Sequence, residues 1–355
     1  MSKARSIQVG GLVVLALGVL ARAHGGELAG RQLLVTSVRT GDTEVFLVDP
    51  ETGDARNLSR RPGSEDRYPC WSPDGRQVAF ISDRDGPPNL YVMDADGGNV
   101  RRLTRTPAVC YMPSWVGDVI VFGMHGEKPE ITSIRPDGSG LRVLGDGHDP
   151  TLSPDGRTIA FTGDVEGGFT VFAMDADGTN RRRVVRETNP LGAVFPSFSP
   201  DGREIVYTQA VGSALELFVV AAAGGEPRQL TRLGKVATPA AWSPDGRFIS
   251  FRLTDEMYWR DKERMRQVYA DRPADKRPVW VIRPDGSGAH VIESLRYQCA
   301  IDGSRAAWRP GEAAGVWDAS RASLRPGEPW REDGGVRSRR MRPPADERRS
   351  ADARP

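Results

Sequence analysis

The sequence predicts an all-β fold built from repeated units of four short strands, and three observations support this prediction. The tetrapeptide S-P-D-G occurs four times, each time followed by Arg and then by an apolar pair, as in "WSPDGRQVAF". Short runs rich in Val, Ile, Phe and Tyr lie between these turns, and Gly, Pro or Asp bounds each run. The chain has 40 Gly and 27 Pro in 355 residues, which suits many short strands joined by tight turns.

The clearest repeat runs from residue 68 to 105 and contains the four strands of one unit. The piece "YPCW" leads into the S-P-D-G turn, "RQVAFIS" follows it, "LYVMD" comes third, and the turn "ADGG" leads to "VRRLT". The same order returns at residues 149–186, 194–232 and 238–295, and a degenerate copy without Ser-Pro lies at 111–145. Self-similarity at this period predicts an array of equivalent structural units rather than separate domains.

The two ends of the repeat region complete one another. Residues 33–59 contain three strand-like pieces but no opening S-P-D-G strand, whereas "AAWRPGE" at residues 306–312 aligns with "AAWSPDG" at 240–246. A strand from one end that completes a unit at the other end closes a β-propeller and leaves no exposed sheet edge. Five complete units and one shared unit therefore predict a six-bladed β-propeller of four-stranded antiparallel blades over residues 31–312, with the first blade completed by a C-terminal strand.

The S-P-D-G turn is interpreted as a structural turn rather than as a catalytic or metal-binding site. Pro presets φ at the second position of the turn, Asp can accept hydrogen bonds from nearby amides, and Gly adopts positive φ. Equivalent acids in several blades are spread around a ring, so metal binding or acid catalysis by them is disfavoured. These acids are Asp74, Asp155, Asp201 and Asp245. We expect the large residue before each turn to pack between adjacent blades: Trp71, Trp115, Leu152, Phe198, Trp242 and Trp308.

The signature W-S-P-D-G-R-x-[IV]-x-F resembles the repeats of the TolB C-terminal propeller and of the wider family of WD-repeat-like propellers. The resemblance extends from Leu33 to Glu312. It implies a periplasmic location and a part in a cell-envelope assembly such as Tol–Pal, with a peptidoglycan-associated or other envelope protein as the partner. TolB carries an α/β domain ahead of its propeller, and the sequence predicts no such domain before Leu33.

Residues 1–23 are interpreted as a signal peptide. Lys3 and Arg5 precede the apolar stretch "GGLVVLALGVLA", which is short for a membrane span, and "ARA" at residues 21–23 offers small residues to a signal peptidase. Cleavage after Ala23 would give a periplasmic or secreted protein that is not integral to the membrane. An uncleaved anchor helix is the alternative.

The C-terminal segment and the overall charge give two further expectations. Residues 313–355 are rich in Arg and Pro and poor in apolar residues, so we expect a disordered tail. The formal net charge is only +2, which does not indicate a nucleic-acid partner.

Three cysteines, Cys70, Cys110 and Cys299, allow one disulfide in three alternative pairings or three unpaired thiols. A monomer is expected.

Catalytic motifs are missing from the sequence. It contains no G-x-S-x-G elbow, no H-E-x-x-H motif, no Walker loop and no dinucleotide fingerprint. His125, His148 and His290 fall in different blades, which gives few ligands for a central metal. We therefore predict no catalytic residue, no metal and no cofactor, and we favour a protein-binding function. The alternative is a carbohydrate lyase or hydrolase that acts at the channel mouth.

The channel mouth is formed by the segments that lead into the innermost strand of each blade, and it is the predicted binding surface. Its candidate partner-binding residues are Arg67, Tyr68, Tyr111, His148, Asp149, Phe195, Tyr297 and Gln298. The alternative is that the aromatic members only pack the ends of the blades.

Residues 252–278 interrupt the repeat in the sixth blade and predict one helical insertion. Thr254 can cap a helix, and Pro273 would stop it. Long insertions on a rigid fold often carry function, so Tyr258, Trp259 and Arg260 are candidate anchors for a partner. A helix that packs as a local brace is the alternative.

Overall fold

The computed structural model describes residues 28–166, 168–186, 192–237, 239–254, 279–292 and 307–310. Within these residues the regular structure is entirely β, which confirms the all-β prediction. The predicted signal peptide, the predicted helix between residues 255 and 278 and the predicted tail lie outside the described residues.

Four separate antiparallel sheets have four strands each. The first has the order β25-β1-β2-β3, with strands β1 (Leu33–Ser37), β2 (Glu44–Val48), β3 (Ala55–Asn57) and β25 (Ala307–Trp308). The second contains β4 (Asp66–Trp71), β5 (Gln77–Ser82), β6 (Asn89–Asp94) and β7 (Arg101–Arg102). The third contains β8 (Val109–Val116), β9 (Val119–His125), β10 (Pro129–Ile134) and β11 (Arg142–Asp146). The fourth contains β12 (His148–Leu152), β13 (Thr158–Val165), β14 (Gly168–Asp175) and β15 (Arg182–Arg183).

The remaining strands form one nine-stranded sheet. Its first run contains β16 (Ala193–Phe198), β17 (Glu204–Val211), β18 (Ala214–Ala221) and β19 (Arg228–Gln229). Its second run contains β21 (Ala241–Trp242), β22 (Ile249–Thr254), β23 (Val279–Ile282) and β24 (His290–Val291). The short strand β20 (Val236–Ala237) joins the two runs, because it pairs in parallel with β18 and antiparallel with β22.

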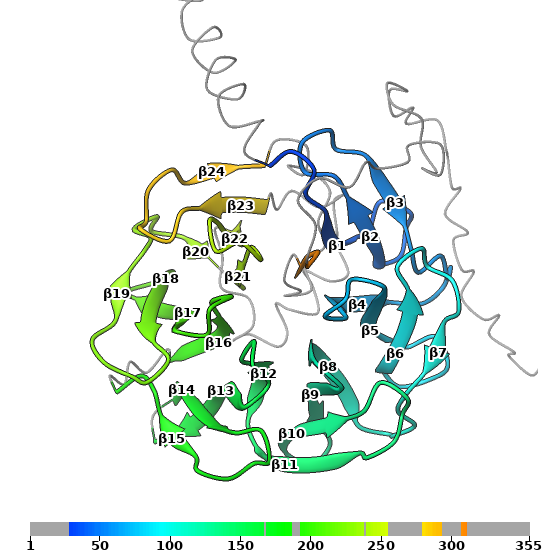
Figure 1. Cartoon of the computed structure of the whole chain (residues 1–355), viewed down its shortest axis with the longest axis horizontal. Helices are drawn as coiled ribbons and strands as arrows, with labels where there is room; N and C mark the ends of the chain where they lie inside the picture. The colour runs from blue at the N-terminus through cyan, green and yellow to red at the C-terminus, as the bar shows by residue number, and fades with distance from the viewer. Residues whose placement is uncertain are drawn as a thin grey trace, which may run out of the picture.

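Figure 1 shows the sheets arranged around a central axis, with the first strand of each set of four nearest the axis. Strands β4, β8, β12, β16 and β21 lie inside, and the short strands β3, β7, β15, β19 and β24 lie at the outer rim. Multiple four-stranded antiparallel sheets in this arrangement are typical of a β-propeller.

The S-P-D-G turn between the first and second strand of a set is held by the same hydrogen bonds in four places. In the first copy, the Ser72 hydroxyl donates to Asp74 Oδ1 at 2.7 Å and accepts the amide of Gln77 at 2.8 Å. Asp74 Oδ1 also accepts the amide of Arg76 at 3.1 Å. The same three bonds recur at Ser153, Ser199 and Ser243. The Asp side chain is therefore engaged in shaping the turn, as the sequence predicted.

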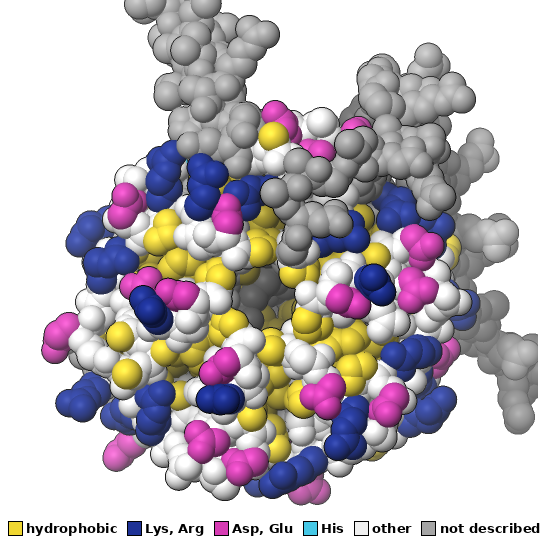
Figure 2. All heavy atoms as spheres, in the orientation of Figure 1, with side chains coloured by type: hydrophobic (Ala, Val, Ile, Leu, Met, Phe, Trp, Pro, Cys, Tyr) yellow, Lys and Arg dark blue, Asp and Glu magenta, His cyan; other side chains and the backbone are white. Residues whose placement is uncertain are grey.

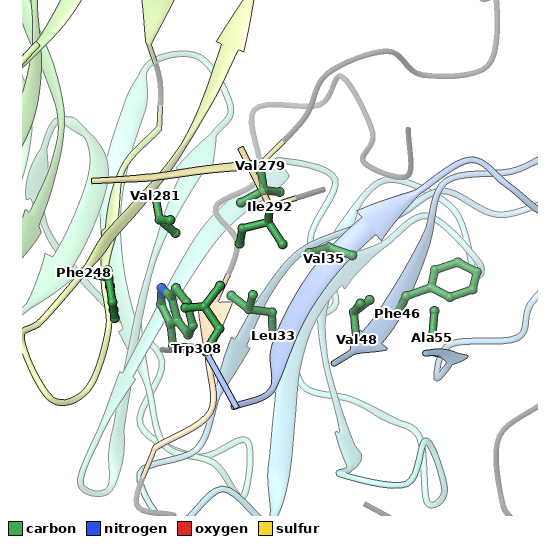
Figure 3. Packing of buried hydrophobic residues seen from close by; sticks show 11 residues of the cluster. Leu33, Val35, Phe46, Val48, Ala55, Phe248, Val279, Val281, Ile292 and Trp308 are labelled. Carbon is green, nitrogen blue, oxygen red and sulfur yellow. The ribbon is translucent and has the colours of Figure 1, made fainter. Parts of the chain in front are cut away.

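Each hydrophobic cluster at the interface between sheets contains residues from two neighbouring sets of strands. Trp71 on β4 packs with Leu34, Val45 and Leu47 of the first sheet, and Phe198 on β16 packs with Val171 of the fourth. Figure 3 shows a cluster that joins Val279 and Val281 of β23 to residues of β1 and β25. The predicted packing of large residues between adjacent sheets is confirmed at these positions. A sheet this small cannot bury its own faces, so its stability depends on its neighbours.

Outer-strand arginines reach across to the next set of strands. Arg142 on β11 donates to the carbonyl of Asp177, and Arg182 on β15 donates to the carbonyl of Ala222, at 3.1 and 2.9 Å. Equivalent bonds join Arg56 to Ala95 and Arg228 to Pro284. Each acceptor lies in the hairpin turn between the third and fourth strands of the neighbouring set.

The same hairpin turns approach the preceding outer strand closely, and Gly97 is the tightest case. Its φ is +85°, and a Cβ atom at this position would lie 2.4 Å from the carbonyl oxygen of Leu58. Gly86 also has positive φ, at +116°, but a Cβ there would meet nothing within 4 Å.

Replacing Gly97 by Ala should lower the free energy of unfolding by at least about 1 kcal/mol more than replacing Gly86 by Ala. Both substitutions carry the cost of positive φ, so their difference isolates the contact between sheets. Urea unfolding of the two variants measures it, and equal midpoints would contradict the role of this contact.

The hydrogen bonds of the turns also predict a dependence of stability on pH. Burial raises the pKa of Asp245, but hydrogen bonds from Arg31, Ser243 and the Arg247 amide outweigh burial and lower it to about 2. A carboxyl whose pKa is lower in the folded state stabilises the fold above its unfolded pKa and loses this effect as pH falls through the folded pKa. The stabilisation is therefore complete at neutral pH and disappears between about pH 4 and pH 2.

Asp245→Asn should be less stable than the wild type at pH 7, and the gap should close as pH falls from about 4 to about 2. Thermal unfolding followed at several pH values tests this expectation. A gap that stays constant over the acid range would show that ionisation of Asp245 does not stabilise the fold.

Candidate functional site

The innermost strands surround an apolar cavity of about 330 Å³ along the central axis. Tyr68 and Met112 line it where β4 and β8 begin or bend, and the prolines of the turns line it farther along the strands. These prolines are Pro73, Pro154, Pro200, Pro244 and Pro310. Figure 2 shows hydrophobic side chains gathered around a hollow at the centre of the molecule. The central channel thus offers a concave apolar surface.

The same backbone conformation shapes the channel mouth at four positions. The residue before a proline adopts left-handed φ, with values of +52° at Tyr68, +48° at Met112, +51° at Asp149 and +58° at Phe195. The strand register shifts at each of these sites, as a β-bulge requires. Non-glycine residues in this region cost about 1–3 kcal/mol each and concentrate at functional sites.

This register refines the predicted set of site residues. Tyr68, Asp149 and Phe195 share the left-handed position, whereas Arg67, Tyr111 and His148 each lie one residue earlier. Met112, rather than Tyr111, is the equivalent of Tyr68. The sequence interpretation missed Met112 because it followed the aromatic residues; the prolines at 69, 113, 150 and 196 carry the correct register.

The remaining predicted site residues fall outside the part of the chain that the structure describes. They include Tyr297 and Gln298 of the channel mouth. They also include Tyr258, Trp259 and Arg260 of the predicted insertion. The predicted site residues that the structure describes therefore come from the second to the fifth set of strands.

Tyr111 lies on β8, one residue before the left-handed Met112. Its ring covers the backbone of Gly123, where a Cβ atom would come within 2.4 Å of ring carbons. The hydroxyl oxygen is buried and has no hydrogen-bond partner among the described residues. Burial, followed by the charges of Asp149, Tyr68 and Asp164, raises the pKa of Tyr111 well above its usual range. These side chains are therefore close enough to interact electrostatically.

Ionisable side chains lie on the neighbouring strands β4, β12 and β13 and next to them. His148 Nε2 lies 3.6 Å from Asp164 Oδ2, and the His148 ring meets the Phe169 ring edge to face at 5.6 Å. Arg67 forms an ion pair with Glu65 at 2.7 Å. Asp149 is 9% exposed, whereas the side chain of Asp164 is 64% exposed. His148 thus contacts an acidic and an aromatic side chain of its own sheet, and Arg67 contacts an acidic neighbour.

Buried polar contacts hold the segments that enter the channel mouth. Asp66, with 0% side-chain exposure, begins β4 and accepts hydrogen bonds from Arg84 to both carboxylate oxygens at 3.0 Å. Because Tyr68 follows two residues later, this pair fixes where its backbone bends. In the next sheets, the amide of Phe195 donates to Thr162 Oγ1 at 3.2 Å across two sets of strands.

The described residues offer little for metal or thiol chemistry. They contain no group of three His, Cys, Asp or Glu side chains that could hold a metal ion. Cys110 carries a free thiol, so neither of the possible disulfides through Cys110 forms. Burial raises the pKa of Cys110, which makes its thiol a poor nucleophile. Cys299 lies outside the described residues.

Known proteins share this architecture. A family model described as the TolB beta propeller domain matches residues 27–193. The structure of TolB from Acinetobacter baumannii superposes with a TM-score of 0.62 at 18% identity, over 84% of this chain and 71% of that one. The structure of putative TolB from Agrobacterium tumefaciens gives 0.59 at 19% identity, over 78% and 93%. The chain has a TolB-like β-propeller fold.

Solved structures with other titles share the fold as well. An oligogalacturonate lyase in complex with manganese gives a TM-score of 0.51 at 19% identity, over 74% of this chain and 73% of that one. A search of curated proteins finds no match to this TolB-like propeller. Among its described residues, no helix has the length and apolar character needed to cross a membrane.

The support of Tyr111 by Gly123 can be tested with a matched pair of glycines. Gly123→Ala would place a methyl group against the Tyr111 ring, whereas Gly126→Ala would meet only Ala108 at 3.7 Å. We expect Gly123→Ala to lower the free energy of unfolding by about 1–3 kcal/mol, because the ring must move, and Gly126→Ala to have a much smaller effect. Urea unfolding measures both. Equal stability of the two variants would contradict the close packing of Tyr111.

Proposed function

We propose that this TolB-like propeller is an exported, periplasmic protein that binds a protein partner at its channel mouth without catalysis. The observation that carries the proposal is the fourfold use of strained backbone around one apolar channel, at Tyr68, Met112, Asp149 and Phe195. Backbone strain of this kind persists only where the surrounding structure enforces it, and it commonly positions binding residues. The likeness to TolB supports the periplasm and an envelope protein, such as a peptidoglycan-associated one, as partner.

The proposal includes a closed ring of six blades. The nine-stranded sheet is counted as two blades, and β25 is the inner strand of the first blade. Leu33 pairs with Trp308, and Leu34 pairs with Ala307, which brings the two ends of the repeat region together. The Arg309 amide also donates to the carbonyl of Gln32 at 2.9 Å. A closed ring would hold the channel mouth in one shape, and this favours recognition of a specific partner.

Protein binding is favoured over lyase chemistry by the groups present in the described channel mouth. The described residues there bring together aromatic side chains, single carboxylates and one histidine, and they contain no set of three metal ligands. Aromatic side chains that surround a concave surface are common anchors in protein interfaces. The partner-binding surface is proposed to extend to Tyr297, Gln298 and the segment with Tyr258, Trp259 and Arg260.

Substitutions at the channel mouth test the proposal. Tyr68→Ala and Phe195→Ala should each reduce capture of the partner from an envelope extract at least tenfold, since interface aromatics often contribute about 2 kcal/mol or more. Pull-down with quantitative mass spectrometry measures the capture. The control is Leu141→Ala, which removes an exposed apolar side chain beside the outer strand β11.

A partner that is captured equally by the wild type and all three variants would place binding elsewhere. Thermal unfolding of each variant shows that a loss of capture does not come from a loss of folding. Capture that is lost in the Leu141→Ala control as well would also count against the channel mouth.

A further inference from the structure

The outer strand of the fourth sheet carries a run of three arginines. Arg181 immediately precedes β15, Arg182 and Arg183 form it, and all three residues are exposed. Arg182 reaches the next set of strands, where it donates to the carbonyl of Ala222 at 2.9 Å. Because side chains alternate along a strand, Arg181 and Arg183 lie together on the other side of β15. Figure 1 shows β15 at the outer rim of the molecule.

Arg181 and Arg183 share one aromatic ring. Their guanidinium carbons lie 4.4 and 5.9 Å from the centroid of the Phe172 ring. This ring stacks on Phe161 with the centroids 5.7 Å apart, and the guanidinium carbon of Arg181 lies 4.9 Å from the Phe161 centroid as well. Arg181 also donates to the carbonyl of Asp146 at 3.1 Å. The aromatic pair thus holds two positive groups next to one another.

Gly163 on β13 makes room for this arrangement. A Cβ atom at this position would lie 2.6 Å from the Phe172 ring and 2.7 Å from Nη2 of Arg181. The backbone of Gly163 does not adopt left-handed φ, so the missing side chain matters for space rather than for conformation. The guanidinium of Arg181 therefore occupies a position that any larger residue at 163 would obstruct.

The charge of the arginine pair is not balanced by an ion pair. Within the described residues, neither Arg181 nor Arg183 lies within ion-pair distance of a carboxylate. Asp175 and Asp177 accept side-chain hydrogen bonds within their own hairpin turn, and the carboxylate of Asp146 pairs with a lysine at 2.7 Å. An arginine side chain stays protonated in proteins, so the pair presents two positive charges to solvent.

Two neighbouring guanidiniums fit a phosphate group better than a carboxylate. One guanidinium already binds both oxygens of a carboxylate through two N–H groups. A phosphate group has three strong acceptor oxygens and carries up to two negative charges, so it can bind two guanidiniums at once. Each guanidinium has five N–H donors, and within the described residues Arg181 gives one of them to Asp146. Donors therefore remain for a ligand.

We propose that Arg181 and Arg183 form a phosphate-binding site on the outer rim of the propeller. The phosphate group lies between the two guanidiniums, beside Phe172. A soluble phosphorylated molecule or a phospholipid headgroup can supply it. The site lies on the rim, whereas the channel mouth surrounds the central axis, so this inference goes beyond the proposed function and does not depend on it.

Titration calorimetry of the full chain with inorganic phosphate, at low ionic strength, tests the site. We expect the Arg181→Gln/Arg183→Gln variant to bind phosphate at least tenfold more weakly than the wild type, because charge-assisted hydrogen bonds from both side chains are lost. The control is Arg105→Gln/Arg232→Gln, which removes two exposed arginines that follow β7 and β19 and should leave the affinity unchanged.

Vesicle flotation distinguishes the two sources of phosphate. Vesicles of phosphatidylcholine are compared with vesicles that also contain phosphatidylglycerol. Binding to the anionic vesicles that is lost in the double variant and kept in the control supports a site for headgroups. Binding of inorganic phosphate without binding to either kind of vesicle supports a site for a soluble phosphorylated molecule.

Three results would overturn the inference. The first is a wild type that binds neither phosphate nor anionic vesicles. The second is equal affinity of the wild type and the double variant, or an equal loss in the control, because binding would then follow overall charge. The third is acetate that competes as well as phosphate, which would indicate a carboxylate-binding site. If thermal unfolding shows that the double variant does not fold, Arg183→Gln alone decides, because Arg183 is exposed.

Discussion

The fold depends on the packing of each small sheet against the next one. A set of four short strands has two apolar faces, and neither can be buried within the set itself. The clusters around Trp71 and Phe198 show the solution, since each brings together side chains from two neighbouring sets. The close approach of Gly97 to Leu58, and the arginine bonds such as that of Arg182 to Ala222, add polar contacts at the rim of the same interfaces.

This arrangement also determines where recognition can occur. The inner strands are fixed by packing on both sides, so their ends can hold strained backbone that an isolated strand would relax. The left-handed residues before Pro69 and Pro150 are examples, and the buried pair of Asp66 with Arg84 secures one of them. The packing between the sheets thus holds Tyr68 and Asp149 in place at the channel mouth.

Much of the fold could be predicted from local sequence, because the turns encode it directly. The S-P-D-G copies at Ser72 and Ser199 use the same Ser and Asp hydrogen bonds, and such short-range geometry needs no tertiary context. The candidate site was harder. Tyr68, Asp149 and Phe195 were among the predicted site residues, but Met112 was missed because its chemistry differs while its backbone position is the same.

The sequence by itself determined the all-β class, the order of strands in each set and the geometric role of the repeated Asp, since these follow from turn chemistry and period. Tertiary structure decided which side chains meet. The burial of the Tyr111 hydroxyl, its proximity to Asp149 and Asp164, and the contact of His148 with Phe169 join residues of different strands and sheets. Such contacts depend on how twisted sheets pack around a common axis, and no local pattern in the chain records that packing.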